Sequence, residues 1–169
     1  LYLNSSQGEE ASGGNTFWNN AAPTDSVISL GTALNTNNSG DAMICYAWHS
    51  VPGYSAFGSY TGNGSADGPF IALDFRPAFF MCKGRNKASN WVIYDTTRGT
   101  INPVVETLGA NLTVNEQTAA ASAIDFVSNG FKIRSTAFGD VNGSGDVYVY
   151  AAFAENPFGG SNVSPANAR

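Results

Sequence analysis

The sequence is short of charge, and this absence excludes several classes of partner. Only 12% of its 169 residues are charged, and the eight Lys and Arg residues form no cluster. Binding to nucleic acid or to an anionic membrane surface needs concentrated positive charge, whereas the net charge here is −5. No apolar run approaches the ~18 residues that a membrane-spanning helix needs. We therefore expect neither nucleic-acid binding nor membrane insertion.

Cysteine and histidine are also scarce: the sequence contains only Cys45, Cys82 and His49. A structural zinc site needs about four ligands at characteristic spacing, which excludes zinc. Cys45 and Cys82 each fall in an apolar run, which is typical of small core residues, although a disulfide between two strands also fits. His49 precedes a Pro-Gly turn without the partner motif of a catalytic triad, which indicates a structural role.

No pair of acidic residues is marked out for polysaccharide cleavage, which needs two carboxylates that face each other across a groove. Residues 140–147 imitate the start of a calcium loop, but the twelfth position is Ala151 instead of Glu, so a hairpin turn is the better interpretation. We expect no enzyme activity, no cofactor and no bound metal. The acidic residues considered were Asp67, Asp74, Asp95, Glu106, Asp125 and Glu155.

Residues that form turns and strands are abundant instead. The chain has 18 Asn, 17 Ser and 19 Gly, and 43% of its residues are apolar, which is enough to fill a core. These features predict an all-β fold, an antiparallel β-sandwich of the jelly-roll or concanavalin-like kind, with few short helices, one of them within 116–123. The predicted strands are 1–3, 26–30, 42–48, 69–75, 78–83, 90–94, 111–114, 124–127, 131–133 and 147–154.

Two of these strands are apolar on both faces. In 42–48, every residue is apolar, which predicts a strand buried between two layers. In 147–154, Val149, Ala151 and Phe153 share one face, and Tyr148, Tyr150 and Ala152 share the other. We expect both strands to lie deep in the fold.

The chain contains a weak internal repeat. Segments 25–31 and 125–130 resemble each other, and each is followed by a Ser-Gly-Asp turn and a strongly apolar run. The repeat predicts that residues 1–50 are the closing part of a preceding repeat unit packed on the next, that 54–158 form the main β-sandwich unit, and that 159–169 are an irregular C-terminal tail. Because Leu1 begins within an apparent strand and no initiator Met is present, we expect this chain to be the end of a longer protein.

Three aromatic residues are candidates for ligand binding: Trp18, Tyr54 and Tyr60. They lie in polar or glycine-rich stretches, where an aromatic ring either anchors a loop onto the body or offers an exposed platform for a sugar. Both interpretations stay open at the level of sequence. The glycines of 54–68 do not form a phosphate-binding loop, because the required Lys and the following helix are missing.

Several segments resemble a family of domains of unknown function that is common in virion and tail-fibre proteins of marine bacteriophages, where it often follows a concanavalin-like lectin domain. The similarity covers nearly the whole chain, and the family has no assigned catalytic residues to transfer. Residues 81–84, Met-Cys-Lys-Gly, depart mildly from the family pattern. The segments that carry the resemblance are 53–70 (GYSAFGSYTGNGSADGPF), 75–79 (FRPAF), 91–95 (WVIYD), 125–134 (DFVSNGFKIR) and 148–158 (YVYAAFAENPF).

The resemblance implies a structural component of a phage virion, in a tail fibre or other exterior appendage. Such a component is expected to be the C-terminal part of the fibre, to assemble as a homotrimer with other virion proteins nearby, and to take part in attachment to a host-surface glycan. Two alternatives are a carbohydrate-binding module with a specific glycan pocket and a capsid decoration protein.

Overall fold

The computed structural model describes residues 1–9, 16–118, 120–136 and 139–158. The chain divides into two compact units, one made of Leu1–Gly8 with Trp48–Arg169 and the other of Glu9–Ala47. We call them the sandwich unit and the Glu9–Ala47 unit, and each is described by itself. The irregular tail predicted over 159–169 lies outside the described residues.

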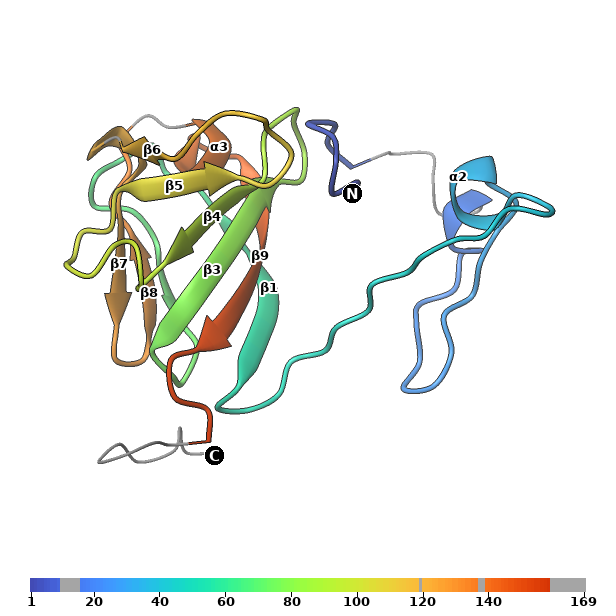
Figure 1. Ribbon diagram of the computed structural model, residues 1–169, viewed down its shortest axis with the longest axis horizontal. Coiled ribbons are helices and arrows are strands. Elements are labelled where there is room, and N and C mark those ends of the chain that lie inside the picture. The colour runs from blue at the N-terminus through green and yellow to red at the C-terminus, as the bar shows by residue number, and fades with distance from the viewer. Residues whose placement is uncertain (10–15, 119, 137–138, 159–169) are drawn as a thin grey trace. The chain divides into compact units, whose positions relative to one another are not determined.

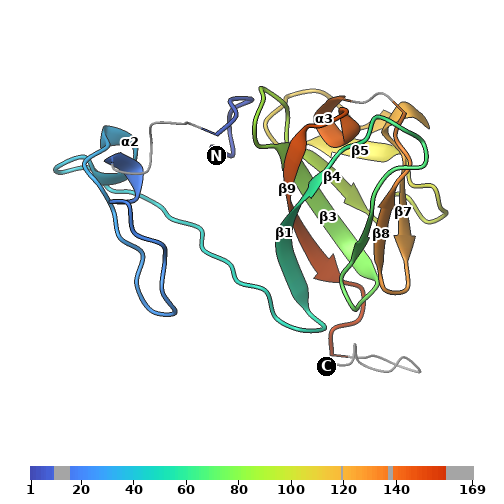
Figure 2. The same ribbon diagram turned by 180° about the vertical axis from the view of Figure 1, so that it is seen from behind.

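The sandwich unit contains two antiparallel sheets, which Figures 1 and 2 show as two facing layers. One sheet has six strands in the order β1-β9-β3-β4-β5-β6, and the other has three in the order β2-β8-β7. This confirms the predicted all-β antiparallel sandwich with few short helices. The bounds are β1 Ser55–Thr61, β2 Phe70–Ala72, β3 Pro77–Gly84, β4 Val92–Asp95, β5 Glu106–Gly109, β6 Gln117–Thr118, η1 Ala120–Ser122, β7 Ile124–Val127, β8 Gly130–Ile133, α3 Gly139–Asn142 and β9 Val147–Ala154.

The hydrophobic core lies between the two sheets. Alternate residues of each strand point inward, so the six-stranded sheet contributes Phe80, Tyr94 and Tyr148 while the smaller sheet contributes Phe126 and Phe131. The rings of Phe80 and Phe131 pack with centroids 4.3 Å apart. Each such buried side chain stabilises the fold by roughly 1.5–3 kcal/mol, so the aromatic layer is a main source of stability.

Local sequence signals placed several strands correctly. The Asn129-Gly130 turn was expected to join two strands, and β7 pairs with β8 from Ile124↔Ile133 to Val127↔Gly130. The glycine-rich stretch 54–68 contains β1, Ser55–Thr61, which pairs with β9 along its whole length. Gly58 fits there because a β-carbon would lie 2.8 Å from the hydroxyl of Tyr150.

The prediction of a buried strand at 42–48 was wrong. This segment belongs to no strand, all of its residues are exposed, and the side chain of Ile44 is 83% exposed. Strands expected at 1–3, 26–30 and 111–114 are likewise absent from the described chain, and residues 24–27 form a turn in which Val27 donates to Thr24 Oγ1 at 3.0 Å. A strand needs a neighbour to pair with, and an apolar pattern alone does not supply one.

The Glu9–Ala47 unit contains the short helix α2, Leu34–Asn37, and backbone hydrogen bonds that join residues 16–17 to residues 31–33. Gly31 and Ala33 donate to the carbonyls of Phe17 and Thr16 at 2.9 and 2.8 Å. Segments 25–31 and 125–130, similar in sequence, differ in structure, because only the second forms a strand. The prediction that residues 1–50 close a preceding repeat unit stays a prediction. In the described part of the chain, no helix is both long and apolar enough to cross a membrane.

Both cysteines are free thiols, but their positions differ. Cys82 is fully buried among the core residues, as predicted. Cys45 is exposed, so the prediction that it fills the core was wrong. The difference follows from the missing strand at 42–48, since Cys45 would have been buried only if that segment lay between layers.

Candidate functional site

The outer face of the six-stranded sheet carries a row of apolar side chains that crosses five strands. The cross-strand partners run in one line: Phe57 of β1, Ala151 of β9, Met81 of β3, Ile93 of β4 and Leu108 of β5. We call this line the apolar row. Its members alternate with core residues along each strand, so they point away from the core. The first four are half-buried, and Leu108 is 36% exposed.

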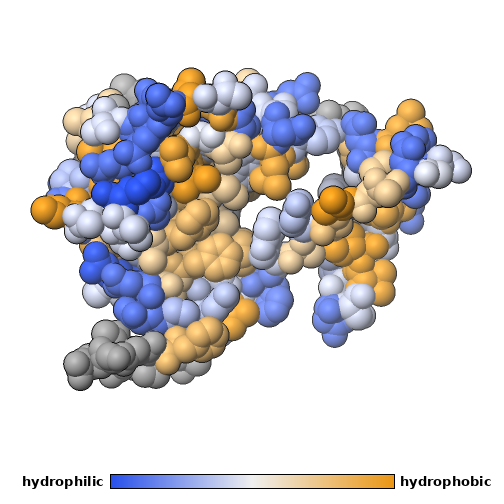
Figure 3. Space-filling model, in the orientation of Figure 1, coloured by the Kyte–Doolittle hydropathy of each residue, from blue (hydrophilic) through white to orange (hydrophobic). Residues whose placement is uncertain are grey.

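An aromatic cluster continues the apolar row at the β1–β9 end of the sheet. Phe153 is at its centre, with ring centroids 5.7 Å from Phe57, 5.9 Å from Phe79 and 6.1 Å from Tyr54. The ring of Trp48 stacks on Phe57 at 6.2 Å, and Phe158 lies 5.6 Å from Tyr54. Figure 3 shows apolar residues gathered over the middle of this sheet, with hydrophilic residues along its sides.

This face is unusual for an antiparallel sandwich. Such sheets ordinarily present an apolar face to the core and a polar face to water. Here β9 is apolar on both faces, since Val149, Ala151 and Phe153 point outward opposite the core residues Tyr148 and Ala152. A contiguous apolar patch on the surface marks a place where another protein or ligand binds.

Two charged residues at the edge of this face, Asp95 and Arg98, form an ion pair, so this pair does not oppose its burial. Asp95, next to Ile93 on β4, receives hydrogen bonds from the backbone amides of Thr97 and Arg98 and from Arg98 Nε at 2.6 Å. Burial raises the pKa of Asp95, but the hydrogen bonds and charge of Arg98 outweigh it, and the net pKa lies below its ordinary value. Arg98 also contacts Glu116 at 3.1 Å. The apolar row itself contains no charged residue.

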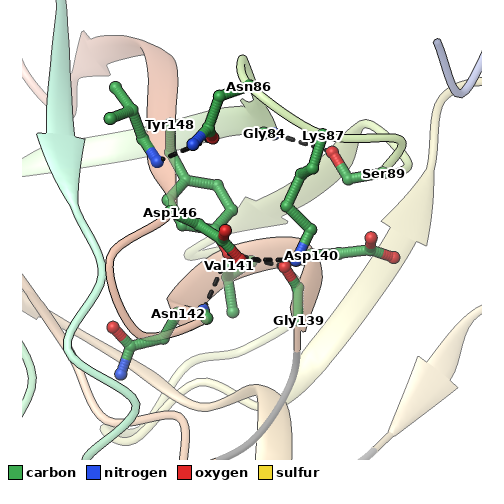
Figure 4. Close-up of polar contacts among 12 residues, drawn as sticks. Gly84, Asn86, Lys87, Ser89, Gly139, Asp140, Val141, Asn142, Asp146 and Tyr148 are labelled. Atoms are coloured by element: carbon green, nitrogen blue, oxygen red, sulfur yellow. Dashed lines mark hydrogen bonds and ion pairs between the residues drawn. The ribbon is translucent and has the colours of Figure 1, made fainter. Parts of the chain in front are cut away.

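A second candidate site is the polar cluster around α3, drawn in Figure 4. Lys87 Nζ contacts Asp146 Oδ2 at 2.6 Å. The hydroxyl of Tyr148 donates to the carbonyl of Gly139 at 2.5 Å and accepts the amide of Gly143 at 2.7 Å. These contacts close the loop between α3 and β9, where a hairpin turn had been expected. Residues 139–142 form one helical turn, and a turn at 143–146, closed by the amide of Asp146 on the carbonyl of Gly143 at 3.1 Å, leads into β9. The predicted turn is therefore present, but it closes no hairpin, because β9 pairs with β1 and β3 and β8 belongs to the other sheet.

Asn142 is the central residue of this cluster. Its side chain is fully buried, its Oδ1 accepts the amide of Asn63 at 2.9 Å, and its Nδ2 donates to the carbonyls of Ser65 and Ser135 at 3.0 and 2.8 Å. Tyr60 adds a bond from its hydroxyl to the carbonyl of Val141 at 2.8 Å. α3 is therefore fastened to the loop after β1 and to the chain after β8.

The contacts of this cluster fix the position of α3 and of the residues before β9. Burial raises the pKa of Tyr60 and of Tyr148, so both phenols stay protonated, and both hydroxyls bond to backbone groups. Lys87 and Asp146 neutralise each other. Across residues 1–9, 16–118, 120–136 and 139–158, no group of three or more His, Cys, Asp or Glu side chains is placed to hold a metal ion.

Lys83 forms buried hydrogen bonds that were not predicted from the sequence. Its side chain is fully buried, and its Nζ donates to the carbonyls of Ser5 at 3.0 Å and Ser89 at 2.5 Å, 5.8 Å from the ring centre of Trp91. Burial lowers the pKa of Lys83, and the charge of Asp140 opposes this only in part. The one signal in the sequence is a lysine at the end of an otherwise apolar strand, 78–83.

Of the three residues predicted to bind a ligand, Tyr54 and Tyr60 belong to the sandwich unit and Trp18 belongs to the Glu9–Ala47 unit. Tyr60 is 7% exposed and belongs to the core, so of the two interpretations that the sequence left open, its ring packs onto the body and is not an exposed platform. Tyr54 is 38% exposed and belongs to the aromatic cluster, whereas Trp18 is 44% exposed in the Glu9–Ala47 unit. Their binding role stays a prediction. Sequence reasoning missed Phe57 and Phe153, although the apolar pattern on both faces of 147–154 was a usable signal.

The acidic residues considered for polysaccharide cleavage are also dispersed. Four of them pair with a basic partner of their own: Asp67 with Lys132, Asp95 with Arg98, Asp125 with Arg134 and Glu155 with Arg76. Asp74 occupies a turn with φ of +61°. Glu106 accepts the amide of Val105 at 3.2 Å through its Oε2.

The sequence profile of a family described as a domain of unknown function, DUF7483, matches residues 1–157. The matched range includes every strand of both sheets. No curated protein and no solved structure matches the chain. What the domain does must therefore be argued from its own surfaces.

Proposed function

The chain belongs to the DUF7483 family of domains of unknown function, and we propose that it is a structural component of a phage virion. It forms the C-terminal part of a tail fibre or other exterior appendage, assembles with itself as a homotrimer, and takes part in attachment to the host surface. The observation that supports self-assembly is the apolar row across five strands. The phage setting is supported by the resemblance of residues 53–70 and by the Asn- and Ser-rich composition.

The apolar row and the aromatic cluster favour self-association on energetic grounds. Covering apolar surface contributes about 25 cal/mol per Å², and a stable interface buries about 800 Å² on each partner. In a closed ring, every copy makes the same contact with the next copy. The apolar face of each chain is therefore covered by its neighbour, and no copy is left with this face exposed. Asp95 and Arg98 form an ion pair at this edge, which lowers the cost of bringing these two charges against another copy.

The experiment is the molar mass of the purified chain by light scattering. We expect a trimer for the unchanged chain and a monomer for Met81→Glu, which places a charge in the middle of the apolar row. Ser128→Glu, in the exposed turn between β7 and β8, is the matched control and keeps the trimer. A β-sheet circular dichroism spectrum shows that each variant is folded. A monomeric unchanged chain contradicts the proposal, as does a trimer that Met81→Glu leaves intact.

A carbohydrate-binding module is the second candidate, favoured by the position of Tyr54. Its ring is 38% exposed beside Phe158, and the partly exposed ion pair of Arg76 and Glu155 belongs to the same end of β9. An aromatic face next to polar groups suits the C–H face and hydroxyls of a sugar. On a glycan array, Tyr54→Ala would abolish binding and Phe70→Ala, an exposed aromatic of the other sheet, would not. A trimer that binds no glycan would contradict the carbohydrate-binding role and would leave only the structural role.

A further inference from the structure

The first eight residues, Leu1–Gly8, belong to the sandwich unit, although residues 9–47 separate them from the rest of that unit in the sequence. We call them the N-terminal segment. The residues in between form the Glu9–Ala47 unit, so chain continuity alone does not hold the segment on the sandwich. Its position depends on the contacts that it makes there. Figures 1 and 2 show the segment, in dark blue, beside the loop that follows β3.

The segment follows residues 85–91, the connection between β3 and β4, in the opposite direction. Tyr2 lies at Trp91, whose Nε1 donates to the carbonyl of Tyr2 at 2.8 Å. Ser6 lies at Ser89, whose amide donates to the carbonyl of Ser6 at 2.9 Å. Residue numbers therefore rise along the segment as they fall along the connection, so one stretch of the sandwich receives the whole segment.

Lys83 adds a contact between these two. Its Nζ donates to the carbonyls of Ser5 and Ser89 at 3.0 and 2.5 Å and lies 5.8 Å from the ring centre of Trp91. The side chain of Lys83 is fully buried, and a buried ammonium group needs such oxygen partners because unpaired charge is costly away from water. The segment supplies one of its two carbonyls.

The donors of this site bind backbone oxygens of the segment. Lys83, Ser89 and Trp91 each donate to a carbonyl, and a carbonyl is present whatever the side chain of the residue that carries it. The side chains of Leu1 and Leu3 are 47% and 41% exposed, so the site does not enclose them. These contacts hold an extended backbone with little regard to its sequence.

Selectivity for a side chain enters at Gly8. A β-carbon at this position would lie 2.7 Å from the carbonyl oxygen of Lys87 and 3.0 Å from that of Arg85. Both neighbours are backbone atoms, which cannot turn aside as the end of a flexible side chain can. Glycine permits this close approach, and a larger residue should push the end of the segment off the connection.

We propose that Lys83, Ser89 and Trp91 form a binding site for an extended peptide segment, and that its ligand is the chain's own N-terminal segment. The site recognises backbone carbonyls at three positions and the lack of a side chain at Gly8. A segment held in this way can be released and replaced by a free peptide of the same sequence. The inference is independent of the proposed self-assembly, because all of its contacts lie within one sandwich unit.

A variant of the full chain can empty the site for a free peptide. A tethered ligand competes at a high effective concentration, so the unchanged chain should bind added peptide only weakly. Gly8→Val should release the tethered segment, and Gly8→Ala, which adds only the β-carbon, is a second releasing variant. Gln7→Val introduces the same side chain at the exposed neighbouring position and is the matched control.

The test measures fluorescence anisotropy of a peptide with the sequence of residues 1–8, labelled after its last residue. We expect the peptide to bind the Gly8→Val chain at least about tenfold more tightly than the unchanged chain or Gln7→Val. The amide of Ser89 should exchange faster with deuterium in Gly8→Val, because its acceptor on Ser6 has moved away. Adding the peptide should slow this exchange again.

Altered peptides test how the segment is recognised. A peptide with Leu3→Ala and Asn4→Ala should bind like the original, because both positions are exposed and the carbonyls are intact. A peptide with Gly8→Val should not bind. In the chain, adding Trp91→Phe to Gly8→Val keeps an aromatic ring but removes the Nε1 donor, so it should weaken peptide binding.

Three outcomes would overturn the inference. A Gly8→Val chain in which Ser89 exchanges faster but which binds no peptide would show that the segment is not a separable ligand. Unchanged exchange at Ser89 in both Gly8→Val and Gly8→Ala would show that the connection tolerates a β-carbon. Equal binding of the original and the Gly8→Val peptides would remove the selectivity. A β-sheet circular dichroism spectrum establishes that each chain variant is folded.

Discussion

The Nζ atom of Lys83 donates a hydrogen bond of 3.0 Å to the backbone carbonyl of Ser5, 78 positions earlier in the chain. The neighbouring Trp91 adds a bond from its Nε1 to the carbonyl of Tyr2 at 2.8 Å, and the amide of Ser89 donates to the carbonyl of Ser6 at 2.9 Å. Together these three residues hold Leu1–Gly8 on the sandwich unit, with Lys83 as the buried member.

Replacing Lys83 should therefore loosen the N-terminal segment. Lys83→Met keeps the apolar stem but leaves the carbonyls of Ser5 and Ser89 without their donor, which should cost about 1–3 kcal/mol of unfolding free energy. The amide of Ser89 should exchange faster with deuterium. Lys132→Met, which removes a contact with the exposed Asp67, is the control and should cost about 1 kcal/mol or less. Unchanged exchange at Ser89 would contradict the assigned role.

Asp95 should make the fold sensitive to acid. Its folded-state pKa lies below the ordinary value because the bonds from Arg98 outweigh burial. The unfolded chain then takes up the proton more readily, so the stabilisation is complete above the ordinary pKa of about 3.9 and is lost as the pH falls through the folded-state pKa. Asp95→Asn should lower the unfolding free energy by about 1–2 kcal/mol at pH 7.

The measurement is urea unfolding of the two proteins at neutral and acidic pH. The difference between the unchanged chain and Asp95→Asn should shrink as the medium becomes more acidic than the folded-state pKa. Asp25→Asn, on an exposed turn of the Glu9–Ala47 unit, is the control for the loss of one negative charge. A difference that is the same at every pH would show that the carboxylate contributes by shape and not by charge.

Asn142 should be among the least replaceable polar residues. Asn142→Ala leaves the amide of Asn63 and the carbonyls of Ser65 and Ser135 buried without their partner, which should cost about 3 kcal/mol or more. Urea unfolding gives the value. Asn115→Ala, at an exposed position, provides the comparison and should change little. A loss of less than about 1 kcal/mol would mean that water replaces the amide.

The two thiols should react at very different rates. Burial raises the pKa of Cys82 to about 12, so almost none of it is thiolate at neutral pH, and its side chain is fully covered. Cys45 is exposed and should account for the single fast thiol in a titration with a disulfide reagent, with the second appearing only in urea. Cys45→Ser should remove the fast phase. Two fast thiols in the folded protein would show that Cys82 is accessible.

Local sequence patterns were sufficient to predict the strands that form hairpins or that have strong β propensity. β9 was placed at its observed bounds, and β7 and β8 were joined by the expected Asn-Gly turn, because both signals depend only on neighbouring residues. The pairing of strands that are remote from each other in the sequence could not be predicted in this way. Residues 42–48 have a strong apolar strand pattern but no partner strand in the structure, and a pattern cannot reveal whether a partner is present.

The apolar row shows the same limit for the candidate site. Phe57 and Leu108 belong to one line of side chains only because the registers of four strand pairs align. Each register is set by tertiary packing and turn geometry, not by the residues of one strand. The sequence could indicate that Val149, Ala151 and Phe153 share a face, but not that Met81 and Ile93 extend it. Lys83 was missed for a related reason, since its partner Ser5 is remote in sequence.

The position of β9 has a consequence for how the protein is made. This strand is the last of the described strands along the chain, yet it lies between β1 and β3 and joins them into one sheet. Until residue 154 has been synthesised, β1 has no neighbour from the six-stranded sheet, and the aromatic residues of the core lack Tyr148 and Ala152. The apolar surfaces of the nascent chain therefore stay uncovered until β9 has been made. This is expected of a fold whose contacts join residues that are remote in sequence. A product truncated before Val147 would lack the strand that joins β1 to β3, so its six-stranded sheet would be incomplete.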